Sequence, residues 1–171
     1  MALTSAERES QALSSRSERV VGMSEVLDVT LSLDTNAYSD GDVLADTQEV
    51  ASAVRVPGGT AILQSVQVLD EDDQGCALTL VFSSGSGTLG TENAAPSISD
   101  ANARNILGYV SVAALDYIDL GGARIATIRG AGLVLKAASG ATSLYIAAIT
   151  RGGTPTYTAA GIKLKLGLLQ D

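Results

Sequence analysis

Apolar and polar residues alternate along several short stretches of the chain from residue 26 onward. In VLDVTLSLD, at residues 26–34, every second residue is Leu or Val and the residues between them are Asp, Thr or Ser. GIKLKLGLLQ, at residues 161–170, repeats the same period of two. This period predicts β-strands that turn one face toward a hydrophobic core and the other toward water.

Similar apolar runs predict further strands, and glycine-rich turns separate them. We expect these strands at residues 48–55, 60–69, 76–83, 109–119, 123–129, 133–138 and 142–150. Gly121-Gly122 is typical of a two-residue hairpin turn, and Ser139-Gly140 separates the next two runs. About nine strands at this spacing favour an all-β fold, an antiparallel, jelly-roll-like β-sandwich.

One short helix is expected in SISDANARNILG, at residues 97–108. Ser97 and Asp100 have the spacing of a capping box, and Gly108 supplies a stop.

The chain divides into an extended N-terminal arm, residues 1–25, and a β-sandwich domain, residues 26–171. The arm is rich in Ser, Glu and Arg, and its apolar residues are too sparse to define a helix face. Such a segment is either a mobile tail or an arm that orders against a partner. In the second case, the expected contacts to a partner or a neighbouring copy are Arg8, Arg16, Arg19, Val20 and Val21.

The net charge of −8 is unevenly distributed. Residues 26–100 carry twelve acidic side chains against Arg55 alone, and residues 101–171 carry seven basic side chains against three acidic ones. The overall acidity disfavours nucleic-acid binding. The two halves could meet across a subunit interface, or the acidic excess could serve only to keep the surface soluble.

Membrane and secretory signals are missing from the sequence. No apolar stretch approaches the ~20 residues of a membrane span, and the N-terminal residues lack the apolar core of a secretory signal. Cys76 is the only cysteine, which excludes an intrachain disulfide and suits a reducing cytoplasm. We therefore expect a protein made in the cytoplasm that makes no membrane contact.

Four consecutive acids stand in VLDEDDQG, at residues 68–75. A calcium loop of the EF-hand type would need a bidentate Glu at its twelfth position, but counting from Asp70 that position is Val81. Asp70, Asp72 and Asp73 remain candidate ligands for a cation site of another type. The simpler interpretation is a polar hairpin turn between strands 60–69 and 76–83, with all four carboxylates solvated and ionised.

Catalytic chemistry is not indicated. The sequence has no histidine, which removes Ser-His-Asp and Cys-His systems and most zinc sites. Cys76 begins an apolar strand and is expected to be a small core residue. We expect neither a catalytic residue nor a cofactor.

Five segments together resemble a family of small structural proteins of tailed bacteriophages: DVLADTQEV, VLDEDDQG, LGTENAAPSISDANARNILG, DYIDLGG and LYIAAITRGGTPTYTA. The resemblance covers residues 26–171 and carries no catalytic motif. It implies a virion component, above all a capsid decoration (cement) protein that forms a homo-oligomer, expected to be a trimer, on the outer surface of the shell. Its partners would then be the major capsid protein and further copies of itself.

Two alternatives remain. The protein could be a tail, connector or baseplate component of the same virion. It could also be a carbohydrate- or calcium-binding sandwich that uses the acidic loops at residues 40–46 and 70–73.

Overall fold

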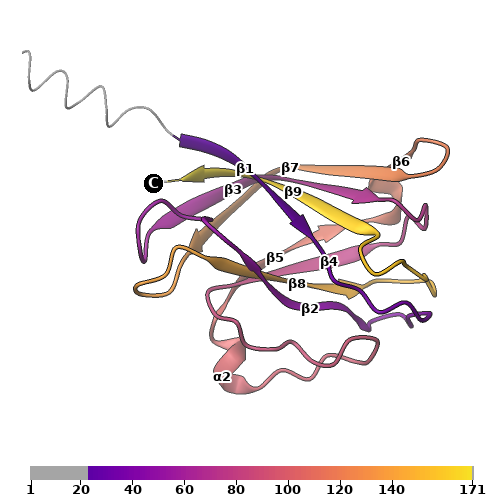
Figure 1. The fold of residues 1–171 in the computed structure, drawn as a ribbon, viewed down its shortest axis with the longest axis horizontal. Helices are drawn as coiled ribbons and strands as arrows, with labels where there is room; N and C mark the ends of the chain where they lie inside the picture. Colours follow the sequence, from indigo (N-terminus) through magenta and orange to yellow (C-terminus); the bar gives the residue numbers. More distant parts are fainter. Residues whose placement is uncertain (1–22, 171) are drawn as a thin grey trace, which may run out of the picture.

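The computed structural model describes residues 23–170 as two antiparallel β-sheets packed face to face (Figure 1). Sheet A contains, in spatial order, β1 (Met23–Thr30), β9 (Ile162–Gln170), β3 (Thr60–Asp70), β7 (Arg124–Lys136) and β6 (Tyr117–Asp119). Sheet B contains β2 (Val43–Val50), β8 (Leu144–Thr150), β4 (Leu78–Ser83) and β5 (Ile106–Val112). Apart from the short β6, this interleaved order is that of a jelly roll. The predicted all-β sandwich is confirmed.

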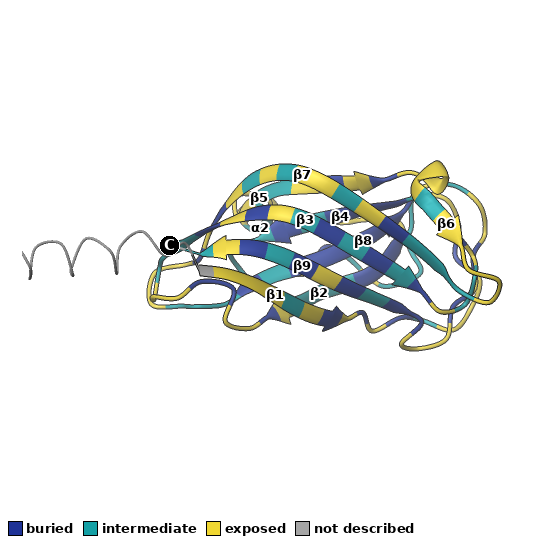
Figure 2. Cartoon of the chain, turned by 90° about the horizontal axis from the view of Figure 1, so that it is seen from above, coloured by how far each residue is buried: buried dark blue, intermediate teal, exposed yellow. Residues whose placement is uncertain are grey.

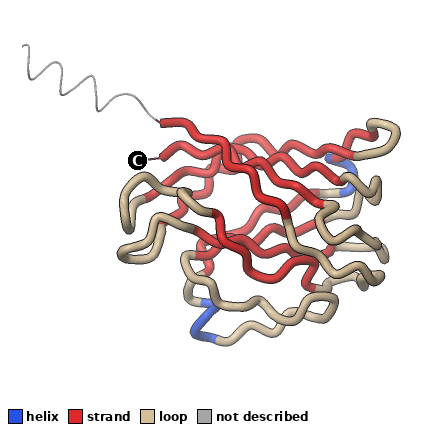
Figure 3. Tube along the Cα trace, viewed as in Figure 1, coloured by secondary structure: helices blue, strands red, loops and turns tan. Residues whose placement is uncertain are grey.

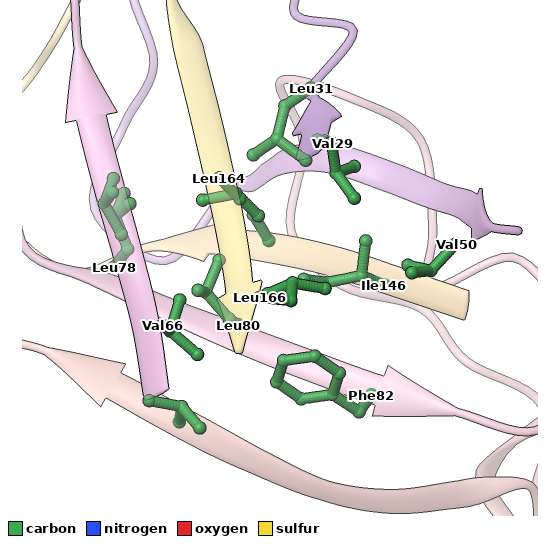
Figure 4. Packing of buried hydrophobic residues seen from close by; sticks show 14 of the residues in the cluster. Val29, Leu31, Val50, Val66, Leu78, Leu80, Phe82, Ile146, Leu164 and Leu166 are labelled. Atoms are coloured by element: carbon green, nitrogen blue, oxygen red, sulfur yellow. The ribbon is translucent and has the colours of Figure 1, made fainter. Parts of the chain in front are cut away.

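The core consists of the inward-facing residues of both sheets. On β9, Leu164 and Leu166 are buried while Lys165 between them is exposed, as the alternation predicts. Phe82 and Leu80 of β4 pack against these leucines from the facing sheet (Figure 4). Because the chain has no Trp and only one Phe, aliphatic side chains fill most of this core.

Two strand predictions differ from the structure. The strands predicted at residues 123–129 and 133–138 are parts of one continuous strand, β7, which ends at Lys136, because Gly130 and Gly132 do not turn the chain back. They adopt φ angles of +66° and +62° where the β3–β7 register shifts, so they form a bulge. The strand expected at residues 48–55 is β2, which begins at Val43 and ends at Val50.

The segment between β5 and β7 is also more divided than expected. Residues 109–119 contain the end of β5, a 3₁₀ turn, η1 (Ala114–Asp116), and β6. Gly121-Gly122 joins β6 to β7 as a hairpin, as predicted. Ser139-Gly140 instead carries the chain from sheet A to sheet B.

The one α-helix among residues 23–170, α2 (Asp100–Ala103), is shorter than expected and has a different cap (Figure 3). The N-cap is Ser99 and not Ser97, and its hydroxyl accepts a hydrogen bond from the Asn102 amide at 3.2 Å. No helix in residues 23–170 is long and apolar enough to cross a membrane.

The two sheets differ in how far other described segments cover their outer faces. The connection at residues 84–105 folds over the outside of sheet B, where Leu89 and Ile98 pack on Ala147 and Ile149. Asp46 holds this connection in place, because its carboxylate accepts hydrogen bonds from the Thr88 hydroxyl and the Leu89 amide. No part of residues 23–170 covers sheet A in this way, and among these residues its outer face is exposed (Figure 2).

Candidate functional site

The acidic segment after β3 connects the two sheets and is not a hairpin turn. Its preceding strand, β3, lies in sheet A and the following strand, β4, lies in sheet B. The hairpin prediction was wrong because consecutive strands in a jelly roll cross between sheets, a relationship that local alternation does not encode.

Asp70 is fully buried, contrary to the expectation of four solvated carboxylates. Its two oxygens accept hydrogen bonds from the amides of Gly75 at 2.7 Å and Asp72 at 3.1 Å, which closes the loop around the carboxyl group. Burial raises the pKa of Asp70, and these hydrogen bonds only partly oppose that shift. Asp70 therefore organises the connection from inside.

The other three carboxylates each bind a separate partner. Glu71 pairs with Lys163 at 2.5 Å and Asp73 with Arg124 at 2.7 Å. Asp72 accepts hydrogen bonds from both the amide and the hydroxyl of Thr158, at 2.8 and 3.0 Å.

The candidate metal ligands do not converge. Asp70, Asp72 and Asp73 face three different parts of the protein, and within residues 23–170 no group of three Cys, Asp or Glu side chains is arranged to hold a metal ion.

Two tyrosine hydroxyls lie buried at the same end of the sandwich. The hydroxyls of Tyr117 and Tyr157 have no hydrogen-bond partner among the described residues. Burial raises the pKa of each, and the negative charge of Asp70 raises it further. These rings stay neutral at any physiological pH, so they contribute packing and a polar interior but no acid–base chemistry.

Cys76 is a core residue, as predicted. It is 9% exposed, and its Sγ donates to the carbonyl oxygen of Gly152 at 2.7 Å. Burial raises the pKa of the thiol, which keeps it in the unreactive protonated form. The open depression beside it, of about 370 Å³, has Arg151 as its one charged lining residue and contains no nucleophile–base pair.

The acidic and basic halves of the sequence are interleaved and do not form separate faces. Because β9 lies between β1 and β3, its lysines meet acids of the other half within one chain. Lys165 pairs with Asp28 at 2.6 Å, and Lys163 and Arg124 pair with acids of the segment after β3. Three of the seven basic side chains of residues 101–171 are therefore paired with acids of the other half inside the protomer.

A first exposed apolar surface lies on the outer face of sheet A, at the end where β1 begins and β9 ends. Ile62 of β3 is directly opposite Leu169 of β9 on one side and Val134 of β7 on the other. These three side chains and Val26 of β1 are between 38% and 61% exposed. We call Val26, Ile62, Val134 and Leu169 the terminal patch.

A second exposed apolar surface lies at the opposite end of the sandwich, where Figure 2 shows η1, β6 and the following turn almost entirely exposed. Leu115 is 97% exposed, Ile118 65% and Leu120 62%, all within six consecutive residues. We call residues 114–120 the tip. Ile118 is opposite Ile125 of β7, which continues this apolar surface onto sheet A.

Sequence reasoning did not identify these two surfaces. Alternation predicts that one face of each strand is apolar and the other polar. Ile62, Val134 and Leu169 each place a single apolar side chain on the polar face of a different strand, and only strand pairing brings the three together. For the tip the signal was present in LDYIDL, which contains three large apolar residues where a polar hairpin would suffice. The predicted contact residues Arg8, Arg16, Arg19, Val20 and Val21 lie outside the described residues.

Comparisons with known proteins give fold likeness only. The chain matches no protein-family model, and no curated protein matches it. Similar solved structures include Desmodium yellow mottle tymovirus, at 11% identity and a TM-score of 0.30 over 85% of this chain and 78% of that chain. Tomato aspermy virus is 9% identical, with a TM-score of 0.34 over 96% and 95%. The VP2 subviral particle of infectious bursal disease virus is 14% identical, with a TM-score of 0.35 over 85% of this chain and 32% of that chain. Likenesses below a TM-score of 0.5 carry no argument about function.

Proposed function

We propose that this protein is a capsid decoration protein that assembles with copies of itself on the outside of a bacteriophage shell and stabilises that shell. The observation that carries the proposal is the open outer face of sheet A, with large apolar side chains exposed at both of its ends. A monomer keeps few such patches unless they bind something.

The chemistry of the interior supports a structural role over an enzymatic one. Two buried ionisable groups, Asp70 and Cys76, form hydrogen bonds with backbone groups of the connections that they organise, and the buried tyrosine hydroxyls have no base beside them among the described residues. The resemblance of residues 26–171 to phage structural proteins supplies the viral setting, since a jelly roll by itself serves many functions.

The N-terminal residues are proposed to clamp the capsid. Residues 1–22 precede β1, which begins at the edge of sheet A. A chain of this length reaches roughly 70 Å when extended, enough to cross onto a neighbouring capsid subunit. Many such contacts across a lattice would add avidity to modest single affinities.

Copy number in purified virions tests the location. Quantitative mass spectrometry against the major capsid protein should give a ratio near one for a protein spread over the head. A ratio of a few per hundred would instead place it in the tail, connector or baseplate, and absence from the virion would refute the proposal.

Binding to shells that lack the protein tests the clamp. Deleting residues 1–22 should weaken binding while the thermal melt of the sandwich stays unchanged. Two matched variants separate the contributions: Arg8, Arg16 and Arg19 changed to Gln remove charge, and Val20 and Val21 changed to Ser remove apolar contact. Undiminished affinity of the deletion variant would refute the clamp without touching the assignment to the head.

A further inference from the structure

The terminal patch and the tip lie too far apart to cover each other within one molecule. Ile62 of β3 is part of the terminal patch. Leu69, further along the same strand, pairs with the residue of β7 that continues the tip surface. Seven residues of extended strand separate them, roughly 20 Å along β3. Figure 2 shows the start of β1 and the end of β9 at the opposite end of the sandwich from β6. Within residues 23–170, therefore, neither surface covers the other.

The charges around the two surfaces are opposite in sign. Arg129 and Lys136 flank Val134 on the outer face of β7, and neither forms an ion pair within the described part of the chain. On that face Asp28 of β1 is paired with Lys165, while the exposed Glu25 is next to Val26 at the edge of the sheet. The outer face of β7 beside Val134 is thus positive.

The tip is surrounded by acids. Asp116 and Asp119 alternate with its apolar residues, and Asp116 forms no ion pair within residues 23–170. Two cations neighbour the tip: Arg124, which is shared by Asp73 at 2.7 Å and Asp119 at 3.6 Å, and Arg151, which lines the depression beside Ala114. The two acids on the tip itself complement Arg129 and Lys136 beside the terminal patch.

The areas also suit a stable contact. From the exposed fractions of their side chains, the tip and the terminal patch each offer on the order of 400 Å² of apolar surface. Joined, they would bury about 800 Å², close to the apolar share of a standard interface of roughly 1,600 Å².

We propose that the tip of one copy docks on the terminal patch of a second copy, so that protomers associate head to tail. This deepens the proposed function, on which it rests, by naming the self-association surfaces of the decoration protein. A head-to-tail contact uses two different surfaces of each protomer, so it closes into a ring when the rotation between copies allows it. A symmetric contact of one patch with itself would stop at a dimer.

Mixing two variants of the purified full-length protein tests the pairing. Leu115→Asp places a charge in the tip, and Val134→Asp places one in the terminal patch. Since both positions are exposed, each variant should still fold and unfold cooperatively but run as a monomer in light scattering coupled to size exclusion; its melting temperature should fall only by what self-association contributes in the wild type. An equimolar mixture should form a 1:1 dimer, because the intact tip of one variant meets the intact patch of the other.

Tyr109→Asp is the matched control, since Tyr109 is 68% exposed but lies on sheet B. It should leave the assembly intact. A monomeric wild-type protein, a mixture that remains monomeric, or a control that dissociates as fully as Leu115→Asp would overturn the proposal. The experiment contains no capsid, so its failure is distinguishable from failure of the proposed function, which the copy number in virions decides.

Discussion

Replacing Asp70 with Asn should change how the stability of the protein depends on pH. The wild-type carboxyl group is buried, and burial raises its pKa above the ordinary 3.8. For a carboxyl group whose pKa is higher in the folded state, the stabilisation is complete below the unfolded pKa and is lost as the pH rises through the folded pKa. The amide of Asn does not titrate.

The expected magnitude follows from linkage. Between about pH 4 and the pKa of Asp70 in the folded protein, the free energy of unfolding of wild type should fall relative to that of Asp70→Asn, by up to roughly 1 kcal/mol per pH unit. In Asp70→Asn the side-chain NH2 group also faces one of the two backbone N–H donors and repels it. This lowers the stability of the variant by the same amount at every pH. Asp70→Ala should be destabilised at every pH by about 2 to 5 kcal/mol, because the amides of Gly75 and Asp72 lose their acceptor.

Urea unfolding of the three proteins from pH 3 to pH 7 measures these differences. The other carboxyl groups are common to all three chains, so their titration cancels in the comparison. A difference between wild type and Asp70→Asn that stays constant across this range, or that grows in favour of wild type as pH rises, would refute the argument. A constant difference would mean that the amide hydrogen bonds balance the effect of burial on the pKa of Asp70, and a difference growing in favour of wild type would mean that they outweigh it.

Three further predictions concern other parts of the fold. Phe82→Ala should lower the free energy of unfolding by about 3 to 5 kcal/mol in urea, because the ring is 1% exposed and its loss leaves a cavity. Asp46→Ala should speed hydrogen exchange in residues 84–105, because Thr88 and Leu89 lose their shared acceptor; exchange within β3 should not change. Cys76 should react with a thiol reagent only after unfolding, and rapid labelling of the native protein would contradict its burial and raised pKa.

Local patterns predicted the strands whose residues have one clear periodicity. Thr60–Asp70 and Ile162–Gln170 appear almost at the predicted bounds, because each alternates clearly, and the lone Gly167 of β9 falls on an outward position and does not interrupt the period. Gly130 and Gly132 misled the prediction, since a bulge and a turn both use glycine at positive φ. Whether these glycines form a bulge or a turn depends on whether β3 pairs with the strand on both sides of them, and the local sequence does not contain that information.

The interaction surfaces and the role of Asp70 depend on pairing as well. A run of four acids indicates solvent exposure, and only the crossing between sheets places the first of them inside the protein. Similarly, Ile62 alone is an unremarkable exposed residue, and it becomes part of a patch because Val134 and Leu169 are its cross-strand neighbours. Sequence alone can suggest the residues of such a site but not their assembly.

The position of β9 between β1 and β3 has a consequence for biosynthesis. Residues 162–170 are translated after the other strands of sheet A, yet they form an inner strand of that sheet. Until then β1 has no strand to pair with, and one edge of β3 stays open, so the nascent chain exposes aggregation-prone backbone. The sandwich can close only after translation of this strand, and removal of these nine residues should abolish folding, whereas insertions at Gly121-Gly122 should be tolerated.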